Sequence, residues 1–137
     1  MVSDDTTNRA GKTLTWLLVF YGLASLAHFV HNAEYLAVYP NLPVWLSRLQ
    51  IYGAWCGITA VGLAGYALYC RDHRFMGLSL LALYAALGFD GLLHYHRAPL
   101  AAHTLSTNLT ILLEVGAAAL ALLAVVKAAF RRVTYGE

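Results

Sequence analysis

Histidine and carboxylate side chains occur in three separate stretches of an otherwise strongly apolar sequence. Imidazole nitrogens and carboxylate oxygens together form the ligand sets of zinc, iron, manganese and copper sites. Ionisable groups at membrane depth are costly and usually serve a function. The groups are His28, His31 and Glu34 in the first stretch, Asp90 and His94 in the second, and His103 and Glu114 in the third.

The composition indicates an integral membrane protein. Of the 137 residues, 60% are hydrophobic and 12% are charged, whereas a soluble domain carries about 25% charged residues. The length fits a single domain, residues 1–137. The formal net charge is +2, and the basic residues lie in short clusters between apolar runs rather than in one patch. We therefore expect no nucleic-acid partner.

Four long apolar runs predict four transmembrane helices, because a helix needs about 20 apolar residues to cross a bilayer. Short polar loops separate the runs, so consecutive helices should be antiparallel neighbours. The predicted fold is all-α, an integral membrane antiparallel four-helix bundle. Its expected spans are about 13–39, 49–69, 75–95 and 101–130.

Basic residues are divided unequally between the two ends of this bundle. Only Arg48 and Arg97 fall at the end with the loops around 40–48 and 97–101, and the other lysines and arginines fall at the end that both termini share. The positive-inside rule then places both termini in the cytoplasm. Because the chain is compact with short loops, we expect a prokaryotic inner membrane, with those two loops on the periplasmic side.

This orientation brings the three polar stretches to one depth. The first and third spans run outward and the fourth begins outside, so all seven groups fall in or next to the outer half of the bundle. His28 and His31 share a helical face, and Asp90 and His94 are one turn apart. His103 and Glu114 begin and end a polar stripe along the fourth span. We expect the three stretches to meet.

The expected site is a metal centre with a catalytic role. Its ion would be a divalent transition metal, zinc or iron first, with manganese and copper as the other choices. Such an ion keeps one position open for water and lowers the pKa of that water to about 7. We assign Glu34 and Glu114 as candidate general bases. The expected metal ligands are His28, His31, Asp90, His94 and His103.

The predicted function is that of a membrane-embedded, metal-dependent enzyme, either a hydrolase or an oxidoreductase. Its substrate would be a membrane lipid or another small apolar molecule, because the bilayer is the easiest route to such a site. The alternative is a bundle that binds or transports metal ions or protons without catalysis, although the inner half offers no matching polar route.

Two further interpretations stay open. The polar groups could simply hydrogen-bond between helices, with each bond contributing about 0.6–2 kcal/mol. Two facing histidines could also bind b-type haem, although carboxylates crowd the same level.

The second span carries small residues at helical spacing. Small residues at this spacing let two helices approach closely in a membrane. We expect this face to pack against a helix, and a homo-oligomer through it is one such arrangement. The residues are Gly53, Gly57, Ala60 and Ala64.

Overall fold

The computed structural model describes the backbone of residues 3–135 and the side chains of residues 11–131. Within residues 3–135 every regular element is a helix, as the sequence predicts. The elements are α1 (Ser3–Glu34), η1 (Leu36–Val38), α2 (Arg48–Cys70), α3 (Arg74–Leu87), η2 (Asp90–Leu92), α4 (Leu93–Arg97), η3 (Leu100–Ala102) and α5 (Leu105–Tyr135).

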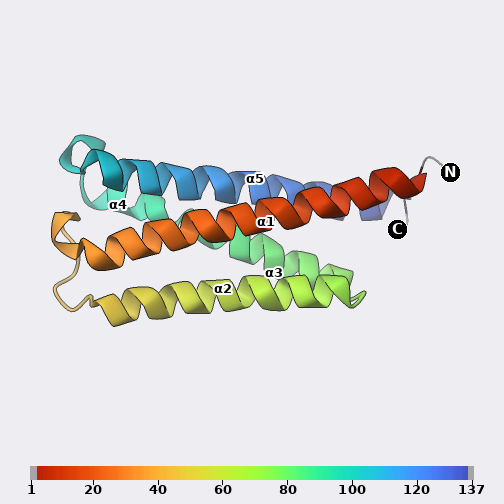
Figure 1. Ribbon diagram of the computed structural model, residues 1–137, viewed down its shortest axis with the longest axis horizontal. Helices are drawn as coiled ribbons and strands as arrows, with labels where there is room; N and C mark the ends of the chain where they lie inside the picture. Colours follow the sequence, from red (N-terminus) through yellow and green to blue (C-terminus); the bar gives the residue numbers. More distant parts are fainter. Residues whose placement is uncertain (1–2, 136–137) are drawn as a thin grey trace.

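The long helices form an antiparallel bundle, shown in Figure 1. α1 packs against α2 and α5, and α3 packs against the same two helices. The α2 and α5 helices are therefore diagonal to each other, with α1 and α3 between them. Both termini lie at one end of the bundle, and η1, α4 and η3 lie at the other, which we call the distal end.

Four segments in the described part of the chain are long and apolar enough to cross a membrane. This result confirms the predicted number of spans and indicates a membrane protein. The bounds of the spans differ most from the prediction at the distal end, where the first span is shorter and the fourth begins later. The four segments are Gly11–Glu34, Arg48–Cys70, Arg74–Arg97 and Leu105–Arg131.

Local signals set where η1 ends and where α5 begins. Pro40 disfavours helical backbone in the residue before it, and Tyr39 accordingly adopts an extended conformation after η1. The Thr104 side chain accepts a hydrogen bond from the Thr107 N–H at 3.2 Å, which is the pattern of a helix N-cap. His103 precedes this cap with extended backbone. The predicted helical stripe from His103 to Glu114 is therefore wrong at its first residue.

The third span is broken rather than continuous. At the break, a Cβ atom on Gly88 would lie 2.5 Å from the Tyr21 ring and 2.7 Å from the Ala118 side chain. Glycine therefore allows α1 and α5 to close around the end of α3. Non-helical backbone is tolerated at membrane depth where protein surrounds it. Asp90 lies in η2 and His94 in α4, which follows η2 directly with helical backbone.

An apolar core fills the half of the bundle nearer the termini. Tyr21 and Tyr84 lie near its distal edge, with ring centroids 4.5 Å apart. The Tyr21 hydroxyl donates a hydrogen bond to the backbone carbonyl of Tyr84 at 3.1 Å. The other buried members are Leu14, Leu18, Ala24, Leu78, Leu81, Ala85, Ala117, Ala118, Ala121 and Val125.

α2 packs through one small-residue face and leaves the predicted one open. A Cβ atom on Gly65 would lie 3.0 Å from the backbone nitrogen of Leu81, so α2 and α3 are in close contact there. On a different face, a Cβ atom on Gly53 or Gly57 would meet nothing within 4 Å. The predicted face therefore does not pack within the described chain, and the homo-oligomer stays a prediction.

Gly77→Ala should destabilise the bundle, because the added Cβ would lie 2.5 Å from the backbone nitrogen of Tyr69. Overpacking of this kind costs about 1–3 kcal/mol. The effect should appear as a lower Tm of the purified protein in detergent. Gly53→Ala is the matched control, and its Tm should be unchanged or higher because alanine favours helix. Equal losses in both variants would contradict the close α2–α3 contact.

A thiol-specific cross-linker should join two chains through Cys56, which is exposed beside Gly53 and Gly57. Cys70→Ser should retain the cross-linked dimer in liposomes, and Cys56→Ser should lose it. Gly57→Leu should weaken the dimer, because a larger side chain keeps two helices apart. A wild-type chain that gives only monomer at every protein-to-lipid ratio would rule out this interface.

Candidate functional site

Buried polar side chains gather in the distal half of the bundle. They come from α1, the segment after it, the broken third span and the start of α5. Most of them are almost inaccessible to solvent, and several lie beside one another at membrane depth. We call this group the polar cluster: Ser25, His28, Asn32, Tyr39, Asp90, His94, His103, Thr107, Thr110 and Glu114.

Three buried imidazoles form a row through the cluster. The ring centroids of His28 and His94 are 5.5 Å apart, and those of His94 and His103 are 6.3 Å apart. The nitrogen atoms His94 Nδ1 and His103 Nε2 are buried without a hydrogen-bond partner among the described residues. Asn32 Nδ2 lies 3.5 Å from His94 Nε2.

Hydrogen bonds assign the proton on two of these rings. His103 Nδ1 lies 3.1 Å from the Pro99 carbonyl oxygen, which can only accept, so Nδ1 carries the proton and Nε2 keeps a lone pair. The Thr110 hydroxyl donates to the Thr107 carbonyl at 3.0 Å. His28 Nδ1, 3.4 Å from that hydroxyl oxygen, is therefore the donor. The neutral His28 ring likewise keeps a lone pair on Nε2.

Glu114 lies at the inner end of the cluster. It is fully buried, at 0% exposure, and neither carboxyl oxygen has a hydrogen-bond partner in the described chain. Its Oε2 atom is 3.7 Å from His28 Nε2. A Cβ atom on Gly91 would lie 3.5 Å from the same oxygen, so the break in the third span lies directly against this carboxyl group.

Asp90 supplies a second carboxyl group from the break. Its Oδ1 atom is buried and has no hydrogen-bond partner among residues 11–131. A buried carboxylate requires a partner charge or a proton. The two carboxyl groups of the cluster therefore require bound protons or a bound cation.

Tyr39 covers the distal side of the cluster. Its side chain is 3% exposed, and its ring centroid is 4.8 Å from that of His94. Burial raises the pKa of Tyr39 to about 12, so the phenol is neutral near pH 7 and hydrogen-bonds to His31 Nδ1 at 2.8 Å. Asn41 anchors the segment, because its Nδ2 donates to the Arg97 carbonyl at 2.9 Å.

The structure brings together five of the seven predicted site residues and places two elsewhere. His31 lies at the partly exposed rim, where Nε2 is 3.2 Å from the Ser106 hydroxyl. Glu34 pairs with α2 instead: its carboxylate is 3.2 Å from the Arg48 guanidinium and accepts a hydrogen bond from Tyr52 at 2.9 Å. The five residues in the cluster are His28, Asp90, His94, His103 and Glu114.

Sequence reasoning missed three members of the cluster. Ser25 and Asn32 lie three residues before and four residues after His28, so helical spacing places all three on one face. This helical spacing can be read directly from the sequence. Tyr39 resembles an interfacial tyrosine in the sequence, and only the turn before Pro40 brings it inside.

The described residues hold no ready-made coordination sphere. Among residues 11–131, no group of three or more His, Cys, Asp or Glu side chains lies close enough together to hold a metal ion. Four of the five predicted ligands, all but His31, share the cluster, but their side chains do not converge on one point as they stand.

Comparison of the chain with protein-family models, with curated proteins and with solved structures finds no match. The functional interpretation therefore rests on the residues of the chain itself.

The ionisation of Tyr39 is directly testable. Wild type and Tyr39→Phe are titrated with alkali and followed by ultraviolet absorbance. The difference between the two titrations reports Tyr39, whose phenol should ionise near pH 12 rather than at the ordinary 10.0. The unfolded chain loses this proton first, so the contribution of Tyr39 to stability should be complete below pH 10 and lost as the pH rises toward 12. A difference spectrum that titrates at the ordinary value would show that Tyr39 faces water.

Proposed function

We propose that this protein is a membrane-embedded, metal-dependent enzyme that acts on a lipid or another apolar substrate. The ion, zinc or iron first, would be held by His28, His94 and His103, with Asp90 as a further ligand. The observation that carries the proposal is the row of three buried imidazoles, in which His94 Nδ1 and His103 Nε2 have no hydrogen-bond partner among the described residues and His28 Nε2 lies 3.7 Å from the Glu114 carboxyl group.

Hydrogen bonds to the far side of each ring favour metal binding. A metal-bound histidine usually donates its other N–H to a carbonyl or another oxygen, which orients the ring and fixes its tautomer. The Pro99 carbonyl does this for His103, and the Thr110 hydroxyl does it for His28. A metal ion would satisfy nitrogen lone pairs and carboxylate oxygens together.

The spacing of the rings suits a shared ion for one pair and requires movement for the other. With metal–nitrogen distances of about 2.1 Å and a tetrahedral angle, two imidazoles on one zinc ion have ring centroids about 5.3 Å apart. The separation of 5.5 Å between His28 and His94 is close to this value, whereas the separation of 6.3 Å between His94 and His103 exceeds it. Because the ligand atoms do not converge as they stand, binding requires the rings to rotate about their side-chain torsions.

Glu114 is the candidate base of the proposed enzyme. A bound ion supplies a Lewis acid and an acidified water molecule, and a neighbouring carboxylate can accept the proton of that water. Glu114 lies against His28, whereas Glu34 is engaged by Arg48 and Tyr52. Charge bias supports a distal end that faces the periplasm of a prokaryotic inner membrane.

A second candidate function is proton uptake without a metal, and the contact between His28 and Glu114 favours it. With His28 Nδ1 donating to Thr110, the 3.7 Å contact from Nε2 to the carboxyl group suits one shared proton. The apolar core lies inward of this pair, so such a site would exchange protons with the distal side only.

Elemental analysis of protein purified without chelator tests the proposal. Wild type should contain about one equivalent of zinc or iron, and His94→Ala and His103→Ala should lose it. His96→Ala is the matched control, because His96 is exposed next to the cluster, and it should keep the metal. A chelator should abolish turnover of a detergent-dispersed lipid.

A wild-type protein that is metal-free and cannot be reloaded would exclude the proposed enzyme. Proton uptake from the distal side of proteoliposomes, absent in Glu114→Gln, would then support the second candidate function.

A further inference from the structure

A groove of about 330 Å³ lies between α1, α2 and α3. Its α1 residues point away from the polar cluster, because Gly22 and Val19 lie on a different helical face from His28. Val19 and Leu63 are exposed at its rim, so the groove opens on a surface that would face lipid. It is lined by Thr15, Leu18, Val19, Gly22, Thr59, Gly62, Leu63, Tyr66, Leu81 and Tyr84.

Two hydroxyl groups in this groove lack a partner in the described chain. Thr59 Oγ1 is buried and makes no hydrogen bond. The Tyr84 side chain is 6% exposed, and its hydroxyl makes no hydrogen bond to another described residue. This hydroxyl lies 3.2 Å from the position that a Cβ atom on Gly22 would occupy. Gly62 leaves room for the Tyr84 ring, since a Cβ atom there would lie 2.8 Å from it.

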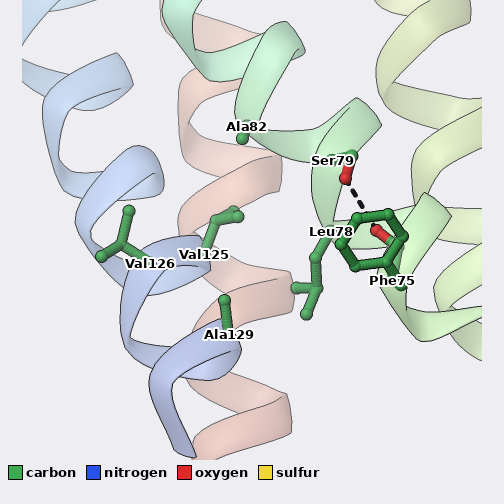
Figure 2. A pocket seen from close by; sticks show the side chains of 7 residues that line it. All are labelled: Phe75, Leu78, Ser79, Ala82, Val125, Val126 and Ala129. Atoms are coloured by element: carbon green, nitrogen blue, oxygen red, sulfur yellow. Dashed lines mark hydrogen bonds between the residues drawn. The ribbon is translucent and has the colours of Figure 1, made fainter. Parts of the chain in front are cut away.

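Two other hydroxyl groups that line grooves on these helices, those of Thr15 and Ser79, have partners. The Thr15 side chain donates to the Gly11 carbonyl at 3.1 Å and pairs with the Tyr66 hydroxyl at 3.1 Å. Ser79 donates to the Phe75 carbonyl at 2.9 Å in a second groove of about 560 Å³ between α3 and α5, shown in Figure 2. That groove has an apolar lining and no unpaired hydroxyl, so it suits a plain acyl chain.

The depth of the unpaired hydroxyls restricts the ligand. Thr59 is in the middle of α2, and Gly22 is in the middle of the first candidate span. Both hydroxyls would therefore lie near the centre of a bilayer, where a polar group without a partner costs several kcal/mol. A phospholipid headgroup does not reach this depth, because charged groups there are costly. A neutral lipid can place a polar group there.

We infer that this groove binds a neutral, bilayer-soluble lipid that carries a carbonyl group. The Tyr84 and Thr59 hydroxyls donate hydrogen bonds to the carbonyl oxygen, and Leu18, Leu63 and Leu81 pack against the apolar body. A quinone ring and the ester of a neutral glyceride share this chemistry. The inference uses residues outside the polar cluster and does not depend on the proposed metal site.

Binding of two probes to the full-length protein in detergent tests the inference. Decylubiquinone and dioleoylglycerol are titrated separately, and bound probe is measured by native mass spectrometry. Wild type should bind one molecule of at least one probe. Thr59→Val and Tyr84→Phe, which remove a hydroxyl with little change of shape, should each weaken binding by about 3- to 10-fold. Ser79→Ala is the matched control and should bind like wild type.

The two probes separate the two sources of the carbonyl. Hydroxyl-dependent binding of decylubiquinone alone assigns a quinone, and such binding of dioleoylglycerol alone assigns a glyceride. The inference would be overturned if neither probe binds, or if the Thr59→Val/Tyr84→Phe double variant binds the probe as tightly as wild type. It would also be overturned if phosphatidylcholine displaces the probe as well as unlabelled probe does. Tm and metal content are measured on the same samples, so that misfolding and failure of the proposed metal site are recognised independently.

Discussion

Buried polar groups at membrane depth require partners, and this requirement organises the distal half of the bundle. Water is absent there to hydrogen-bond with an exposed carbonyl, carboxyl or imidazole group. The chain gathers these groups into one cluster, so that they share partners inside the protein. Glycine at position 88 lets α1 and α5 close around the broken third span, and Tyr39 covers the group from the distal side.

The two halves of the bundle are built on different principles. Near the termini, small and aliphatic side chains let the helices pack closely, and Tyr21 and Tyr84 close off this apolar part near its distal edge. The distal half has hydrogen bonds and unpaired ligand atoms between α1, the broken third span and α5, and a smaller apolar cluster of Phe29, Ala33 and Ile51 between α1 and α2. The unpaired ligand atoms are a cost to stability that a bound ion or proton can offset, which explains why the proposed chemistry belongs in this half.

Hydropathy and periodicity were sufficient to predict the helical class, the number of spans and the clustering of five site residues in the distal half, because these depend on hydropathy and on helix direction. Details that depend on tertiary contacts were not predictable from spacing. Glu34 fits the HxxHxxE pattern, yet Arg48 and Tyr52 on α2 engage it. The break at Gly88 depends on Tyr21 and Ala118, which are distant in sequence, and the position of Tyr39 depends on the turn after α1.

The location of Glu114 has an electrical consequence. Its carboxyl group is buried at the inner end of the polar cluster, with apolar packing between it and the end of the bundle that carries the termini. A cation that reached Glu114 from the distal side would cross part of the transmembrane field and stop. Crossing the whole field changes the energy of one elementary charge by about 2.3 kcal/mol per 100 mV. Occupancy of this group would therefore vary with membrane potential without requiring an ion to cross the whole bundle.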